Sequence, residues 1–415
     1  MEPIHILQQG AQKTAGGSVV QRVVRYKFLV FLFLTPLFFL PLTLSPVTLN
    51  KQLFAGVVAL SFLVYVLAFF LARGKMMLPR SATAVSALIF LGTIGISTAL
   101  SSARLTSVFS TSGDSLFWVA VYVISFLLVL FFLDRKEWVV NSAVLLFSSV
   151  SLLAIYGLLQ LSGVFIFPLS FTQSVNFNPI GSPFLLAFVA GGMFVALVSF
   201  ISFSQAKLKY WFEPYIMWAL AGLFVLLLVH VNLWTLWLAV VVALAVALVI
   251  ALYRNIWQAR GAHYSLRQFM MPLFIIIAAM FFVLARPSFP SFLTPLTEVS
   301  PSASATFDVA KSALISKDFA FGTGPGTFGF AYSEHKPLII NQTLFWGVQF
   351  AQGFSPLLSY LTTWGVLGML AFLAFVGLVF KPRLEAKRFR IGLRAGFCVG
   401  GVVLAWISSP DRFSH

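Results

Sequence analysis

The residues that could do chemistry in this chain lie in a few polar segments between long apolar runs. Arg104 and Arg286 each lie beside the end of an apolar run and face a sizeable polar segment, and Lys336 lies within the segment that Arg286 faces. Arginine binds phosphate oxygens through paired hydrogen bonds and lysine acts as a point charge, so these cations could hold a diphosphate. For each of them, a solvated or interfacial charge is the alternative.

A glycine-rich stretch, FGTGPGTF at 321–328, carries Gly322, Gly324 and Gly326. Its backbone is free to adopt positive φ angles and could bring amide groups close to a ligand. The same composition is also typical of a simple turn. Trp346 follows in an aromatic segment, and aromatic faces can stack on sugars, although aromatic side chains also anchor membrane proteins at the lipid interface.

Metal and disulfide chemistry have little support in this sequence. Carboxylates with Asp-x-Asp spacing are absent, and no cluster of histidines and acidic residues has the spacing of metal ligands. Cys398 is the single cysteine. We therefore expect no bound metal, no other cofactor and no disulfide within the chain.

The elements that must position these residues are helices in a membrane. Hydrophobic residues make up 60% of the 415 residues and charged residues 9%, against roughly a quarter charged in soluble domains. The apolar runs are long enough to cross a bilayer core of about 30 Å, and the alternating pattern of a β-barrel is absent. We predict an all-α polytopic integral membrane protein with about eleven transmembrane helices, or twelve if a final helix follows. The predicted spans are 28–44, 52–72, 81–101, 115–133, 138–164, 181–204, 214–230, 233–253, 269–285, 355–380 and 391–408.

The distribution of charge orients these spans. With a cytoplasmic amino terminus, most of the 27 Lys and Arg residues lie on the cytoplasmic side, as the positive-inside rule requires. The net charge of +16 therefore needs no nucleic-acid partner, and its basic clusters could contact lipid head groups. The predicted parts are a cytoplasmic tail (1–27), nine spans (28–285), a large exterior loop (286–354), two spans (355–408) and an exterior tail (409–415).

Two local structures are expected outside the membrane. Within the large loop, residues 302–317 predict a surface helix whose apolar face would hold Phe307, Ala310 and Leu314. The uncharged stretch FNPIGSP at 177–183 combines asparagine, proline and glycine, as a tight re-entrant turn would.

The predicted spans contain almost no ionisable side chain. An ion-coupled transporter would be expected to place carboxylates or a broken-helix ion site within the membrane. We therefore expect the chemistry at the exterior surface, and keep a transporter or flippase of lipid-linked sugars as the alternative.

Several stretches between about 80 and 380 form a pattern when taken in order. They are STALSSARLTSVFSTSG at 97–113, IYGLLQLSG at 155–163, NFNPIGSPFLLA at 176–187, FGTGPGTFGFAY at 321–332 and GVLG at 365–368. The clearest feature is the order of an amphipathic helix, a glycine-rich loop and a span that opens with two glycines. Together these stretches resemble the superfamily of O-antigen ligases and O-antigen polymerases.

The resemblance implies a glycosyltransferase of the bacterial inner membrane. It would move a glycan from a polyprenyl diphosphate carrier to an acceptor hydroxyl on a lipid, a glycan or a protein at the outer face. Metal-independent transfer is implied, with basic residues on the diphosphate and a histidine that activates the acceptor.

Two positions depart from the family pattern. Phe354 stands where the family has its histidine, and the family arginine is missing from the helix before the glycine loop. The nearest exterior titratable residues are Glu334 and His335, and histidine has the more suitable ordinary pKa. We expect His335 as the base with Glu334 as the alternative, and a catalytically degenerate family member is the further possibility.

Overall fold

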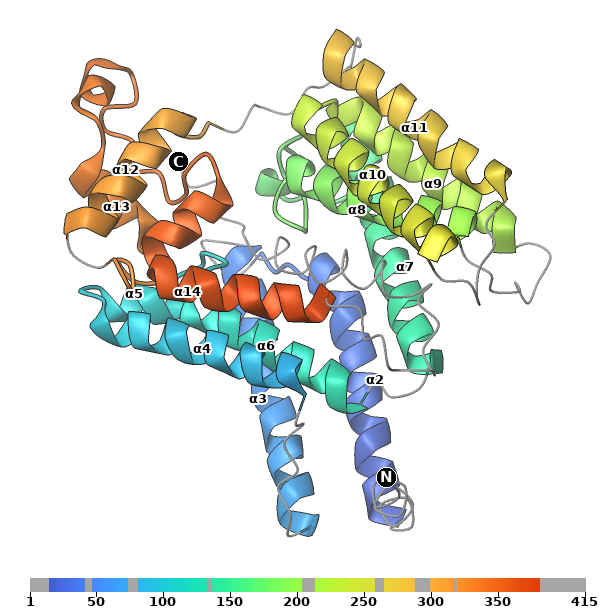
Figure 1. The fold of residues 1–415 in the computed structure, drawn as a ribbon, viewed down its shortest axis with the longest axis horizontal. Coiled ribbons are helices and arrows are strands. Elements are labelled where there is room, and N and C mark those ends of the chain that lie inside the picture. The colour runs from blue at the N-terminus through green and yellow to red at the C-terminus, as the bar shows by residue number, and fades with distance from the viewer. Residues whose placement is uncertain are drawn as a thin grey trace.

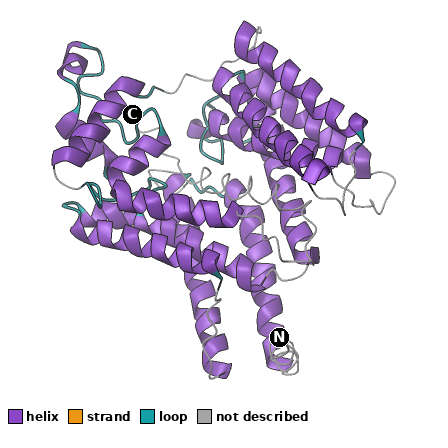
Figure 2. Ribbon diagram, in the orientation of Figure 1, coloured by secondary structure: helices purple, strands orange, loops and turns teal. Residues whose placement is uncertain are grey.

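The computed structural model describes residues 15–41, 47–73, 81–132, 136–203, 213–257, 265–287, 299–316 and 319–380. Within these ranges the protein is helical, with 13 α-helices and two short 3-10 helices (Figure 2). The described residues form no sheet; their one β-bridge joins Asn178 and Gly181. The predicted all-α class is confirmed.

The helices are listed here in chain order. They are α2 (Ala15–Leu37), α3 (Thr48–Arg73), α4 (Ala82–Leu100), α5 (Arg104–Phe109), α6 (Leu116–Phe132), α7 (Lys136–Leu161), η1 (Ser170–Thr172), α8 (Pro183–Phe203), α9 (Glu213–Val231), α10 (Trp234–Trp257), α11 (Leu266–Ala285), α12 (Ala303–Ser316), α13 (Phe328–His335), η2 (Leu338–Gln342) and α14 (Pro356–Phe380).

Eight of the described helices are long and apolar enough to cross a membrane: α3, α4, α7, α8, α9, α10, α11 and α14. Each coincides with a predicted span, which confirms a multi-pass membrane protein by helix length and hydropathy. The predicted span at 115–133 corresponds to α6, whose apolar part is shorter. The predicted span at 391–408, the predicted tail at 409–415 and residues 1–14 of the predicted tail at 1–27 lie outside the described residues.

The predicted first span at 28–44 is wrong in its limits, because α2 begins earlier and ends at Leu37. Proline can stand near the end of a helix but stops its continuation, and Pro36 lies in the last turn of α2. Lys51 is only 2% exposed and donates a hydrogen bond from Nζ to the Pro36 carbonyl at 3.2 Å. A buried lysine side chain therefore satisfies a carbonyl at the end of α2.

The described helices pack in groups. Helices α4, α6 and α14 lie side by side, with α12 and α13 beside one end of α14 (Figure 1). Helices α8 to α11 form another group, and α7 connects it to α2 and α3 through contacts with α2. The group of α4, α6 and α14 runs across the view in Figure 1, whereas α3 points away from it.

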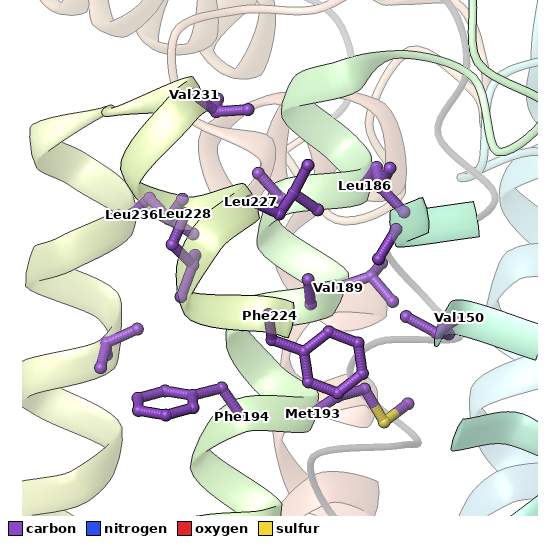
Figure 3. Packing of buried hydrophobic residues seen from close by; sticks show 14 of the residues in the cluster. Val150, Leu186, Val189, Met193, Phe194, Phe224, Leu227, Leu228, Val231 and Leu236 are labelled. Carbon is purple, nitrogen blue, oxygen red and sulfur yellow. The ribbon is translucent and has the colours of Figure 1, made fainter. Parts of the chain in front are cut away.

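The largest cluster of buried side chains lies between α7, α8, α9, α10 and α11. Leu186 and Val189 of α8 face Leu227 and Phe224 of α9 (Figure 3). Lipid tails are as apolar as these side chains, so close van der Waals packing rather than the hydrophobic effect holds such helices together. Helix α8 lies at the centre of this group, and 67% of its apolar stretch is buried by the helices around it.

The helix predicted at 302–317 is present as α12, and the Oγ atom of Ser302 accepts a hydrogen bond from the Ala305 amide at 3.1 Å. The expected apolar face is partly wrong, because Phe307 is 56% exposed. Val309 and Ala313 instead join Phe328 and Tyr332 of α13 in a small core. Helix α12 packs against α13 and α14, so its buried side chains are those that face these two helices.

The predicted turn at 177–183 is also present. The Gly181 amide donates to the Asn178 carbonyl at 2.8 Å, and the Ile180 amide donates to the Asn178 side-chain oxygen at 3.1 Å. The turn lies against α7 at Gly157, where an added Cβ would lie 3.5 Å from the side-chain nitrogen of Asn178.

Candidate functional site

The candidate site begins at a break in α14. Gly365 has φ 68° and ψ −176°, which interrupts the helix. A break within a membrane helix leaves backbone groups without partners unless another segment supplies them. Residues 319–324 do so here: the Phe319 carbonyl accepts from the Val366 amide at 3.1 Å, and the Ala320 carbonyl accepts from the Leu367 amide at 3.0 Å.

The glycine-rich loop completes this pairing from the other side of the break. The Thr323 amide donates to the Thr362 carbonyl and the Gly324 amide to the Thr363 carbonyl, both at 3.0 Å. We call the pairing of 319–327 with the broken turn of α14 the interlock. Its backbones lie so close that a Cβ added to Gly322, whose φ is 69°, would lie 2.5 Å from the Gly365 nitrogen.

Serines in the last turn of α4 and in the stretch after it hold the other face of the glycine loop. Ser97 Oγ donates to the Phe321 carbonyl at 2.6 Å, and Ser101 Oγ donates to the Thr323 carbonyl at 3.0 Å. Ser107 Oγ donates to Ser101 Oγ at 2.9 Å. The hydroxyl groups therefore satisfy carbonyls of the loop, where apolar side chains would leave them unpaired.

Asp114 joins the three parts. Its side chain is 3% exposed, and Oδ2 accepts hydrogen bonds at 2.9 Å from the Gly326 amide and from Thr363 Oγ1. Its Oδ1 accepts from Ser112 Oγ, and its backbone carbonyl accepts from Trp364 Nε1 at 3.1 Å. One carboxylate thus connects the glycine loop, the broken helix and the segment before α6.

Asp114 was not among the residues predicted from the sequence. The available signal was its position as the only acidic residue in the serine- and threonine-rich stretch 97–115, directly before an apolar helix. A polar stretch outside the predicted spans carries no sign that it will be buried, so the sequence favoured the exposed cations instead.

The predicted glycines lie together in the interlock. Gly322, Gly324 and Gly326 all have positive φ angles, as expected for this stretch. The amides of Gly324 and Gly326 donate to acceptors of the protein itself. The conformational freedom of these glycines serves the close approach of two backbones, and a contact of these residues with a substrate stays a prediction.

Arg104 is the predicted cation that lies nearest this site. It begins α5, and its side chain is exposed. Helix α5 lies against the glycine loop, since a Cβ added to Gly326 would lie 2.7 Å from Ser110 and 3.5 Å from the Thr106 carbonyl.

Arg286 lies elsewhere in the described structure. It follows α11 with a left-handed φ of 43°, and its guanidinium carbon lies 5.1 Å from the ring centre of Trp234. Helix α11 belongs to the group of α8 to α11, apart from α5 (Figure 1). A common diphosphate site for Arg104 and Arg286 stays a prediction.

The remaining predicted residues lie at the end of the short helix α13 and in the segment that follows it. His335 is its last residue and is partly exposed, and Glu334 is exposed. Lys336 Nζ donates to the Trp346 carbonyl at 2.5 Å, while the Trp346 side chain is 66% exposed. The structure thus brings Lys336 and Trp346 together.

Two neighbours complete this region. Phe354, which stands where the resembled family has its histidine, is 55% exposed, and its amide donates to Thr306 Oγ1 at 2.9 Å. One turn before His335, burial raises the pKa of Tyr332, whose hydroxyl has no hydrogen-bond partner among the described residues. The catalytic and binding roles of the residues predicted here stay predictions.

Groups of three or more His, Cys, Asp or Glu side chains that could hold a metal ion are not found within the described ranges. Comparison with known proteins finds no matching family model, no matching curated protein and no matching solved structure.

Proposed function

We propose that this protein is a membrane glycosyltransferase of the O-antigen ligase or polymerase kind. It would move a glycan from a polyprenyl diphosphate carrier to an acceptor hydroxyl at the outer face of the bacterial inner membrane. One observation carries the proposal: the stretches 97–113, 321–332 and 365–368, on which the resemblance rests, meet in the interlock. Segments so far apart in the sequence would have no reason to meet if each were an unrelated turn.

The same geometry weighs against the alternative of a transporter or flippase. A broken helix in a transporter exposes carbonyl groups that coordinate an ion. Here the carbonyls of Thr362 and Thr363 accept hydrogen bonds from amides of the glycine loop. The break therefore serves to anchor the exterior loop, which favours chemistry at the exterior surface.

In the proposed reaction, the acceptor oxygen attacks the anomeric carbon of the donor sugar. A bond forms between that carbon and the acceptor oxygen, and the bond from the carbon to the diphosphate oxygen breaks. The acceptor proton passes to His335, with Glu334 as the alternative base. Arg104, Arg286 and Lys336 hold the departing diphosphate, and Trp346 stacks on a sugar ring. No cofactor takes part.

The first test concerns the base. A positioned proton acceptor contributes about 10²–10⁴ in rate, so His335→Ala should lower turnover at least about tenfold while donor binding is unchanged. Turnover is measured as transfer of a labelled glycan from its polyprenyl diphosphate by the purified full chain. His230→Ala, at the end of α9, is the control and should keep full activity. Full activity in the double variant Glu334→Ala/His335→Ala would reject both candidates.

A second test concerns the diphosphate. Arg104→Ala and Arg286→Ala should each weaken binding of the polyprenyl diphosphate donor by about 10- to 100-fold, because a hydrogen bond to a charged group contributes about 1.5–3 kcal/mol. Arg267→Ala is the matched control, since this exposed arginine lies in the first turn of α11, far from Arg286 along that helix. Unchanged binding in both variants would remove the two arginines from the site. Donor binding without any transfer in the unaltered chain would favour a degenerate family member.

A further inference from the structure

The segment between α13 and α14 exposes large apolar side chains. Residues 337–354 include no charged residue, although loops in water are ordinarily polar. Leu344 is 94% exposed and Leu338 is 82% exposed. We call residues 338–348 the apolar segment, and its exposed large side chains are Leu338, Ile339, Leu344, Phe345, Trp346 and Val348. Exposed apolar side chains grouped in this way mark a contact with a protein or a membrane.

One side of the apolar segment is attached to the rest of the protein. Ile340 within it and Phe350 just after it pack on the small core that α12 and α13 form. The Gln349 side chain donates from Nε2 to the Gly329 carbonyl at 3.2 Å. The exposed side chains therefore belong to a segment that is fixed to α13, and they point away from that attachment.

The backbone of the apolar segment supplies several of its own hydrogen bonds. The Thr343 amide donates to the Ile340 carbonyl at 3.0 Å, and the Trp346 amide donates to the Thr343 carbonyl at 3.2 Å. The Trp346 carbonyl in turn accepts from Lys336 Nζ. Irregular backbone does not occur in the hydrocarbon core of a membrane, because its polar groups would lack partners there. A segment that satisfies part of its backbone suits the head-group region, where water and lipid head groups can bind the rest.

The apolar surface continues from this segment to the start of α14. Phe354 is 55% exposed, and Leu357, in the first turn of α14, is 57% exposed. Helix α14 is long and apolar enough to cross a membrane, so its exposed apolar side chains face lipid. The uncharged stretch 337–354 thus leads directly to a lipid-facing surface.

We propose that residues 338–348 insert into the head-group region of the membrane on the side at which α14 begins, and hold α12 and α13 against the lipid surface. A charged side chain in the apolar layer is costly, and this segment has none. Tryptophan, here Trp346, is enriched at this boundary. Lipid rather than a second protein is the occupant because the surface continues without a charge into a helix that crosses the membrane. This inference does not depend on the proposed transferase activity.

The experiment measures the depth of a fluorescent label on the full chain in phosphatidylcholine nanodiscs. Cys398→Ala removes the single cysteine, and Leu344→Cys then carries the label. Lipids with a nitroxide near the head-group end of the acyl chain should quench this label at least about threefold more than a label on Ser312→Cys, since interfacial segments lie about 5–10 Å deep. Iodide in the water should quench the two labels in the opposite order. Ser312 is the control because it is exposed on α12, one turn after the exposed Asp308.

A second label position separates the segment from the label itself. A label on Ile339→Cys should be quenched by the same lipids, and Leu338→Asp with Leu344→Asp should lower that quenching at least about threefold, because charges are costly in the apolar layer. All three side chains are exposed, so these changes leave the buried core intact. Equal iodide quenching at residues 344 and 312 would overturn the proposal. A label at 344 that is shielded from both iodide and lipid would mean that protein covers the segment, which would also overturn it, as would unchanged lipid quenching in the double Asp variant.

Discussion

Gly322→Ala and Gly365→Ala should each destabilise the protein by about 3–6 kcal/mol. Both residues have positive φ angles, of 69° and 68°, which an alanine adopts only with strain. The added Cβ would also meet backbone atoms of the opposite segment: at Gly322 it would lie 2.5 Å from the Gly365 nitrogen and 2.6 Å from the Thr362 carbonyl oxygen. Backbone atoms held by hydrogen bonds from both sides cannot move aside as a side chain can, so strain and overpacking add.

The measurement is unfolding of the detergent-solubilised chain by denaturing detergent or by heat. Gly377→Ala is the matched control, because it lies in the same helix as Gly365 and an added Cβ would meet no atom within 4 Å. That variant should change stability by less than about 1 kcal/mol. A similar small effect at Gly322 and Gly365 would mean that the interlock does not form.

Asp114→Ala should cost at least about 3 kcal/mol. The change removes the acceptor from the Gly326 amide, from Thr363 Oγ1 and from Ser112 Oγ at once. Hydrogen bonds to a charged group contribute about 1.5–3 kcal/mol each, and the Gly326 amide would lose its acceptor. Thr363 Oγ1 could still donate to the Ser359 carbonyl, which lies 3.1 Å away. Asp114→Asn should have an intermediate effect, since one acceptor oxygen is kept.

A double-mutant cycle separates this role from a general loss of packing. Asp114→Asn and Thr363→Val should be coupled by about 1–2 kcal/mol, because the two side chains share a hydrogen bond. Asp308→Asn combined with Thr363→Val should be additive, since Asp308 is exposed on α12. Additive effects for Asp114 and Thr363 would contradict the bridge described above.

These two predictions concern residues that contribute in different ways. Gly322 and Gly365 permit the backbones to approach, and Asp114 holds the approaching parts together. The proposed transfer chemistry depends on both only indirectly, through the position of α13 and of the residues that follow it. The stability measurements therefore test the interlock without assuming any activity.

The apolar runs determined the helical class and the position of most long helices. Span length and hydropathy are local properties, and a chain in lipid must satisfy its backbone within each helix. This is why the spans predicted at 81–101, 181–204 and 214–230 agree closely with α4, α8 and α9. The glycine-rich loop and the turn at 177–183 were also apparent, since glycine permits and proline restricts backbone conformations locally.

The tertiary structure alone decided what these local elements do. From hydropathy alone α14 is an ordinary span, but the break at Gly365 is stable only because residues 319–324, which precede the helix, supply hydrogen-bond partners. Asp114 could not be predicted for the same reason. A carboxylate in a serine-rich stretch is expected to be solvated, and only the fold buries this one against Gly326 and Thr363. Hydropathy records what each segment prefers by itself, whereas burial and hydrogen bonding between segments depend on which segments meet.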